Sequence, residues 1–153
     1  MTRDRFVDIA PGLLQPDWDL PEGAGALLTT RAGGQSTGPF ASFNLGGHVG
    51  DDPAAVAANR ARLRGFLPAD PLWLNQVHGA AVAEADLSEG VPEADAVLAR
   101  SSGRVCAVLT ADCLPVLLCD DDASVVAAAH AGWRGLAAGV LENTVRQMGV
   151  PPH

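Results

Sequence analysis

Three residues able to bind a metal ion lie where apolar runs of the sequence begin or end. His78 follows LWLNQV, Cys113 lies in TADCLP, and His130 ends VVAAAH. Sheets commonly present functional side chains at strand ends, so we expect these three residues to share one site. Their separations along the chain match no compact zinc-finger spacing. The hypothesis therefore depends on residue type and position.

Two imidazoles and one thiolate would make an open metal site with three protein ligands. Catalytic zinc is commonly held this way, with water in the fourth position, and the pKa of that water falls toward about 7. The same ligands also resemble a trigonal copper site, which usually has a weak axial ligand. Neither methionine, Met1 or Met148, is a convincing axial ligand. We therefore expect Zn²⁺, with Cu²⁺ as the alternative.

Each of these residues also has a simpler structural interpretation. A lone histidine near a core is more often a hydrogen-bonded structural residue, and cysteine is commonly buried as a small hydrophobe. The second interpretation suits Cys106 and Cys119, which lie inside apolar runs. Cys113 differs because it follows Asp112 and precedes Pro115, where a small apolar side chain has no obvious task. Both interpretations stay open for Cys113.

The segment AGWRG, which follows His130, has features of an anion site. Gly132 and Gly135 open the backbone, and we expect a helix to begin near Arg134. Free N–H groups and the helix dipole would favour phosphate there, and Arg134 could add a bidentate contact. Arg134 could equally cap or pair structurally. Trp133 would either pack in the core or offer an aromatic face to a base.

One apparent catalytic motif is discounted. GQSTG at 34–38 matches G-x-S-x-G, but a nucleophile elbow needs a helix directly after the serine, and Pro39 with more loop follows Ser36. No G-x-G-x-x-G follows a predicted strand, so a dinucleotide fingerprint is absent.

Composition excludes further classes of function. The chain has no Lys and no Tyr, which excludes a Schiff base, a P-loop lysine and a tyrosine acid or base. The net charge of −8 argues against nucleic acid or anionic lipid as a partner. No signal segment and no stretch as long as a membrane span is visible. We therefore expect a cytoplasmic protein whose three cysteines stay reduced.

The elements that must position these residues are mostly strands. Length and composition, 153 residues with 48% apolar, favour one domain. A glycine-rich loop precedes a helix that should start at Pro53, after Asp51 and Asp52. The strands, several apolar on both faces as in a covered sheet, are expected within 25–30, 91–99, 104–110, 114–119 and 125–130, and a last helix over 134–148. Clustered strands with few helices predict an α+β fold with a mixed sheet.

Several ordered blocks together resemble a known family, the YfiH-like laccase-domain proteins. The blocks are TTRAGGQSTGPFASFNLGGHVGDDP, WLNQVHG, ADAVLA, TADCLPVLL and AAAHAGWRGLAAGV, and they span residues 27–148. The family is also called the polyphenol oxidase or purine nucleoside phosphorylase family. The resemblance implies a layered α/β sandwich with mixed β-sheets and a mononuclear metal site held by His78, Cys113 and His130. Family chains usually continue further, so residues 1–153 are expected to be a single domain, the N-terminal portion of a longer family domain.

The resemblance also implies an activity. It suggests phosphorolysis of adenosine, inosine or guanosine, related cleavage of methylthioadenosine, and adenosine deamination. A copper-dependent polyphenol oxidoreductase and a hydrolase that edits peptidoglycan precursors are the enzymatic alternatives. A structural-zinc module is a further alternative, and it would need a fourth ligand such as His48, another cysteine or a carboxylate.

Candidate substrate contacts complete the hypothesis of a purine nucleoside enzyme. Arg134, with Arg31 as a second candidate, would hold phosphate. Asp95 or Asp112 would protonate or orient the purine. Asn44 would contact the ligand or support the site, unless it only stabilises a turn.

Overall fold

The computed structural model describes residues 6–151, which form two compact units. The first unit runs to Leu20 and resumes over Gly25–Leu67, and the second comprises Pro21–Ala24 and the chain from Pro68 onward. The expectation of one domain over residues 1–153 stays a prediction. All three proposed metal ligands belong to the second unit.

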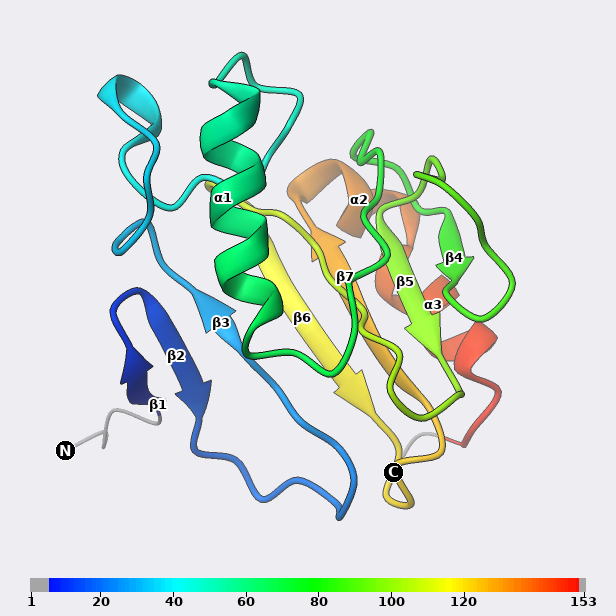
Figure 1. Cartoon of the computed structure of the whole chain (residues 1–153). Coiled ribbons are helices and arrows are strands. Elements are labelled where there is room, and N and C mark those ends of the chain that lie inside the picture. Colours follow the sequence, from blue (N-terminus) through cyan, green and yellow to red (C-terminus); the bar gives the residue numbers. More distant parts are fainter. Residues whose placement is uncertain (1–5, 152–153) are drawn as a thin grey trace, which may run out of the picture. The chain divides into compact units, whose positions relative to one another are not determined.

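A small antiparallel sheet begins the first unit. It comprises β1 (Phe6–Ala10), β2 (Leu13–Pro16) and β3 (Leu28–Thr29) in that order (Figure 1). Gly12, in the turn between β1 and β2, has φ +78°, and a Cβ there would lie 1.9 Å from the carbonyl oxygen of Ala32. Only glycine fits this turn. The strand expected within 25–30 is confirmed, although it is only two residues long.

Helix α1 (Pro53–Arg64) starts where the sequence predicts. The side chain of Asp52 accepts a hydrogen bond from the backbone N–H of Ala54, and Pro53 occupies the first turn, where its missing N–H costs nothing. Val56 and Leu63 are buried on one face of this helix. A short 3₁₀ helix, η1 (Gly38–Phe40), lies in the preceding glycine-rich loop.

Asn59 is a buried polar residue of α1 that organises the glycine-rich loop. Its side-chain amide donates hydrogen bonds to the Ser36 hydroxyl and to the carbonyl oxygens of Ser42 and Asn44, and it accepts one from the N–H of Gln35. A buried amide needs such partners, because desolvation without them is costly. One helical side chain therefore satisfies backbone groups that no strand pairs.

The second unit contains a four-stranded mixed sheet, which confirms the predicted α+β class. Its strands are β4 (Val82–Glu84), β5 (Ala96–Ala99), β6 (Leu114–Cys119) and β7 (Val126–Ala131), in the order β4-β5-β7-β6. Strand β4 is parallel to β5, whereas β5 and β6 are both antiparallel to β7. Three strands therefore run in one direction and β7 runs in the other (Figure 1).

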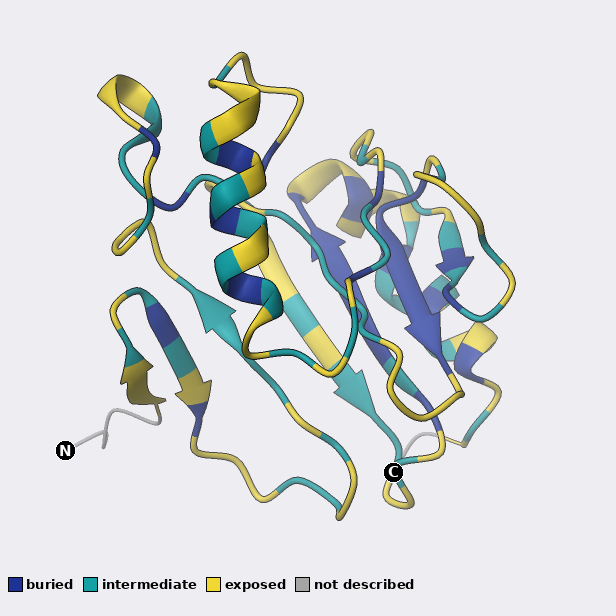
Figure 2. Ribbon diagram, in the orientation of Figure 1, coloured by how far each residue is buried: buried dark blue, intermediate teal, exposed yellow. Residues whose placement is uncertain are grey.

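The two central strands of this sheet are buried on both faces (Figure 2). One face packs against helix α3 (Val140–Met148), with Ala129 against Val140 and Ala127 against Met148. On the other face, Val97 and Ala128 belong to a second cluster with residues of the irregular segments, Leu74 and Ala94 among them. The many alanines of β7 leave room for close approach from both sides.

Three expectations about these elements were wrong. Segment 104–110 is not a strand, because its pairing with another stretch of backbone is limited to an isolated bridge between Cys106 and Leu72. The last helix is broken at Gly139, which has φ +87° and separates α2 (Trp133–Ala138) from α3. Strand β6 is not covered on both faces, since it lies at the sheet edge with Leu114 59% exposed. Hydrophobicity alone does not distinguish an edge strand from a central one.

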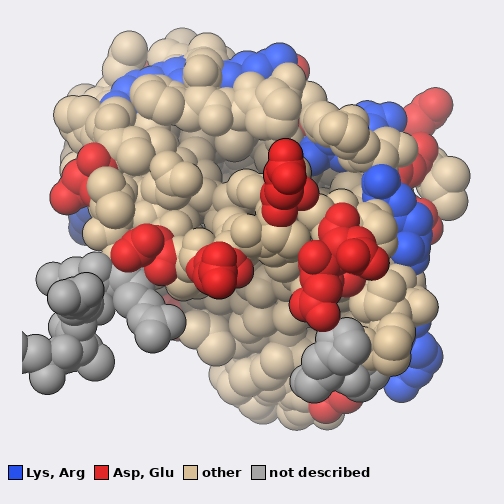
Figure 3. Space-filling model, turned by 90° about the horizontal axis from the view of Figure 1, so that it is seen from below, with Lys and Arg blue, Asp and Glu red and all other residues tan. Residues whose placement is uncertain are grey.

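The surface and the helices agree with the composition. On the face shown in Figure 3, acidic side chains form separate clusters among neutral residues, in line with the net charge of −8. Among residues 6–151, no helix has both the length and the apolar character needed to cross a bilayer.

Candidate metal centre

Strand direction brings the candidate ligands to one end of the strands of the sheet. Because β4, β5 and β6 are all parallel to one another, they begin at the end of the sheet where β7 finishes. Cys113 directly precedes β6, and His130 lies next to the last residue of β7. Asp95 directly precedes β5, and His78 lies shortly before β4. Residues far apart in the sequence therefore meet at the same end of the sheet.

A glutamine fastens the two ligand-bearing loops together. The side-chain amide of Gln76 donates to the carbonyl oxygen of Leu109 at 2.8 Å and accepts from the N–H of Leu109 at 2.7 Å. This pair of bonds imitates the pairing of two strands. It holds the segment that leads to His78 beside the segment that leads to Cys113.

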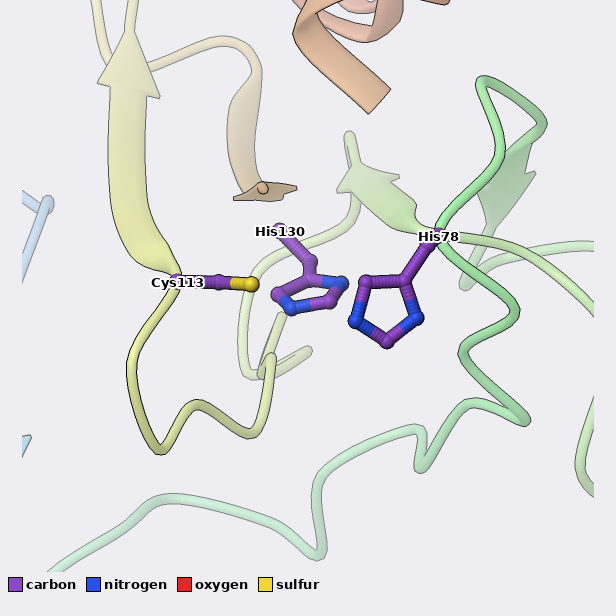
Figure 4. Close-up of side chains that lie close together, drawn as sticks. All are labelled: His78, Cys113 and His130. Atoms are coloured by element: carbon purple, nitrogen blue, oxygen red, sulfur yellow. The ribbon is translucent and has the colours of Figure 1, made fainter. Parts of the chain in front are cut away.

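The potential ligand atoms of His78, Cys113 and His130 lie within 4.8 Å of one another. The two imidazole rings have centroids 4.8 Å apart and are inclined by 72°, and the sulfur of Cys113 points toward the His130 ring (Figure 4). In a tetrahedral zinc site the donor atoms are about 3.3–3.7 Å apart, given Zn–N and Zn–S bonds of about 2.1 and 2.3 Å. Small side-chain rotations would therefore let all three donors reach one ion.

The trio is open on one side. His130 is buried, Cys113 is half-buried and His78 is exposed. Two imidazoles and a thiol form a donor set that suits zinc or copper, and three ligands leave a position for solvent or substrate. No other group of three such side chains within residues 6–151 could hold a metal ion.

Asp95 lies directly behind the trio and is completely buried. One carboxylate oxygen, Oδ1, is 2.8 Å from Nδ1 of His130 and accepts the backbone N–H of His78 at 2.9 Å. The other oxygen, Oδ2, accepts the N–H groups of Val77 at 3.1 Å and Gly79 at 2.7 Å. The carboxylate therefore has partners on both oxygens and no exposed surface for a substrate.

These partners keep the carboxylate ionised. Burial by itself would raise the pKa of Asp95, but the hydrogen bonds from His130 and from the N–H groups of Gly79, Val77 and His78 outweigh it and lower that pKa. An ionised carboxylate can only accept hydrogen bonds. Nδ1 of His130 must then carry the proton, which leaves Nε2 with a free lone pair for a metal.

The backbone at His78 has an uncommon conformation. Its φ is +60°, in the left-handed region that few residues other than glycine adopt. Such strain persists only where neighbouring structure enforces it, and it is typical of functional sites. Here the three hydrogen bonds from Val77, His78 and Gly79 to Asp95 enforce it.

The other predicted residues of the second unit are exposed. Asp112 adjoins Cys113, and Arg134 lies in α2 with its guanidinium carbon 5.1 Å from the centroid of the Trp133 ring. Trp133 is 74% exposed, so it does not pack in the core. Helix α2 has only six residues, so its dipole offers little to an anion, and Arg134 supplies the positive charge there.

Arg31 and Asn44 belong to the first unit, where both are engaged in the glycine-rich loop. Arg31 donates two hydrogen bonds to the carbonyl oxygen of Ala41. Asn44 bonds both backbone groups of Gly46 and the carboxylate of Asp51, as a turn-stabilising asparagine does. Their part in substrate binding stays a prediction.

Sequence reasoning missed two organising residues and discounted a third. Nothing in the sequence marked Asn59 or Gln76, because their value depends on backbone groups distant in the chain. Ser36 is 4% exposed and donates its hydroxyl hydrogen to Asp51, so it is a buried structural residue.

Comparison with known proteins shows the family of this chain. A family model described as multi-copper polyphenol oxidoreductase laccase matches residues 25–152. The chain belongs to this family, which confirms the predicted resemblance to YfiH-like laccase-domain proteins.

Named relatives share this sequence closely. The chain is 57% identical over 138 residues to the purine nucleoside phosphorylase PA4543 of Pseudomonas aeruginosa, covering 90% of this chain and 57% of that protein. It is 52% identical over 139 residues to the purine nucleoside phosphorylase YfiH of Escherichia coli, covering 87% and 56%. The chain thus spans between half and two thirds of the length of these curated relatives.

Solved structures show the same fold. The protein NMB0706 of Neisseria meningitidis matches with a TM-score of 0.86 and 50% identity, over 92% of this chain and 59% of that one. YlmD of Geobacillus stearothermophilus matches with a TM-score of 0.87 and 36% identity, over 98% and 62%.

Proposed function

We propose that this chain carries the zinc centre of a purine nucleoside enzyme, with phosphorolysis of adenosine, inosine, guanosine or methylthioadenosine as its reaction. The observation that carries the proposal is the convergence of His78, Cys113 and His130 at one end of the sheet, in a site that is open on one side. The names of the relatives point to purine nucleosides as substrates. Adenosine deamination and a cytoplasmic location belong to the same proposal.

Zinc, when bound by the three ligands, would supply a Lewis acid beside the reacting bond. In phosphorolysis, phosphate attacks C1′ of the ribose while the purine leaves, so positive charge develops on the sugar and negative charge on the base. Arg134 is the exposed cation of this unit nearest in sequence to a ligand, and we assign it to phosphate, with Arg31 as the second candidate. Asp112 is exposed where Asp95 is buried, so we assign purine contact to Asp112.

A copper-dependent polyphenol oxidoreductase is the second candidate, because the family description names that activity. The ligand trio suits copper as well. Met148, however, packs with Leu98, Val125 and Ala127 in the core, so it is no axial ligand. Zinc therefore fits the described residues better.

The proposal is tested by metal analysis and product analysis of the purified chain. We expect about one zinc ion per chain, and adenine with ribose 1-phosphate from adenosine when phosphate is present. Inosine formed without phosphate would show deamination. Oxygen uptake with phenols and a copper–thiolate absorbance would favour the oxidoreductase, and cleavage of a peptidoglycan precursor alone would favour the editing hydrolase.

Two cysteine variants provide the matched pair. Cys113→Ala should lose both zinc and nucleoside turnover, whereas Cys119→Ala, at the far end of the same strand, should keep both. Full zinc content in folded Cys113→Ala would reject the ligand set.

A further inference from the structure

We propose that Asp95 is the positioning residue of this centre, a single carboxylate that sets the orientation of both histidine ligands. The inference rests on the proposed zinc site but concerns a residue that is not itself a ligand. It predicts that the geometry of the site depends on a residue that touches neither metal nor substrate.

Asp95 holds the side chain of His130 through its ring nitrogen. Its Nδ1 lies 2.8 Å from Oδ1 of Asp95, and both side chains are buried, so the pair is shielded from competing water. The backbone repeats the connection, since the N–H of His130 donates to the carbonyl oxygen of Asp95 at 2.7 Å. Fixing Nδ1 fixes the ring, and Nε2 on the opposite side is then the atom presented to the metal.

Asp95 holds His78 through the backbone. Three successive N–H groups, those of Val77, His78 and Gly79, donate to the same carboxylate. They keep His78 in its left-handed conformation, with φ +60°. The exposed imidazole meets the His130 ring edge-on, with the two centroids 4.8 Å apart, and the direction from which it approaches is set by this backbone.

The bonds to His130 and to the backbone around His78 come from one carboxylate that is firmly attached to the sheet. Asp95 directly precedes β5, and its neighbour Ala96 pairs with Ala129 of β7 and is fully buried. The carboxylate is therefore attached to the central pair of strands. A residue that only stabilised the loop would need only the bonds from the backbone N–H groups, and a residue that only oriented His130 would need only the bond to Nδ1. Asp95 makes both kinds of bond at once.

The variant Asp95→Asn tests the proposal. Each carboxylate oxygen of Asp95 accepts two N–H groups, but the amide nitrogen of asparagine cannot accept a hydrogen bond. In Asp95→Asn, the two N–H groups on that side would therefore face another donor. Loss of such a partner typically weakens metal binding ten- to hundredfold. We expect Zn²⁺ affinity, measured by competition with a chromophoric chelator, to fall by about that factor.

Asp86→Asn is the matched control. Asp86 also accepts backbone N–H groups, those of Arg100 and Ser101, but it contacts none of the three ligands. We expect that variant to bind zinc as the wild type does. Equal zinc affinity in wild type, Asp95→Asn and Asp86→Asn would overturn the proposal, and so would equal weakening in both variants.

Nitrogen NMR of the wild type tests the role of Asp95 even if Asp95→Asn fails to fold, because it reports the tautomer of His130. In metal-free wild type at pH 8, His130 should be protonated at Nδ1 and bare at Nε2, whereas free histidine prefers the opposite tautomer. A proton on Nε2 of His130 would overturn the proposal. A wild-type chain that binds no zinc contradicts the proposed metal centre instead, and the tautomer then still decides on Asp95.

Discussion

A Cβ atom placed on Gly132 would lie 2.7 Å from the sulfur of Cys113 and 3.5 Å from Cδ2 of His78. The space that a side chain would fill is therefore occupied by the proposed metal centre. Gly132 has φ −69° and ψ 163°, which any residue adopts, so no backbone requirement explains a glycine there. The explanation is close approach to the sulfur.

Gly132→Ala should therefore displace the Cys113 thiolate and weaken zinc binding with little effect on folding. A separation of 2.7 Å is below any van der Waals contact, so the sulfur must move. We expect at least tenfold weaker zinc binding in a chelator competition. Gly25→Ala is the control, because a Cβ there meets nothing within 4 Å. Unchanged affinity in Gly132→Ala would show that the thiolate tolerates the shift.

Trp133→Ala should hardly change stability, because the ring is 74% exposed. We expect the free energy of unfolding in urea to change by about 0.5 kcal/mol or less. If the ring stacks on a purine, nucleoside binding should weaken by about 1–3 kcal/mol. The half-buried Trp73 provides the comparison, since Trp73→Ala should destabilise more. Equal destabilisation by both changes would contradict the exposed position of Trp133.

Cys106 should resist alkylation in the folded chain. Burial, followed by the nearby charge of Asp86, raises the pKa of its thiol to about 12. At pH 8 only about one thiol in ten thousand is then the reactive thiolate. Iodoacetamide labelling and peptide mass spectrometry should show slow modification of Cys106 that becomes fast in urea. Fast labelling without urea would contradict the raised pKa.

The same pKa predicts a loss of stability in alkali. The unfolded chain releases the thiol proton above the ordinary pKa of 9.0, whereas the folded chain keeps it up to about pH 12. Unfolding is therefore favoured increasingly as pH rises from 9 toward 12. Cys106→Ala removes this contribution, so the difference in stability between wild type and variant should change with pH above 9. A constant difference would contradict the raised pKa.

Asn59→Ala should destabilise the first unit by about 3 kcal/mol. The substitution leaves several groups of the glycine-rich loop without partners, each at a cost of about 1–3 kcal/mol, partly relieved by water. Urea unfolding measures the total, and hydrogen exchange should locate faster opening at Gln35. Asn75→Ala, at an exposed asparagine, is the control and should be nearly neutral.

Much of the fold could be predicted because local signals determined it. Asp52 and Pro53 marked the start of α1, and the boundaries of β6 were those of the apolar run LPVLLC, which begins after Cys113 and ends before the acidic turn at Asp120. Gly139 was overlooked as a helix break, because glycine inside an apolar stripe is often tolerated. Segment 104–110 has the composition of a strand, although no strand pairs with it.

By itself, the sequence determined which side chains could carry chemistry, namely His78, Cys113 and His130, because residue type and strand-end position are local properties. Only the tertiary structure decided how they are held. The sequence offered Asp95 only as a possible purine contact, and the direction of β5 relative to β7 places its carboxylate against His130. Hydrogen bonds between residues distant in the chain depend on strand order and direction, which no short stretch of sequence records.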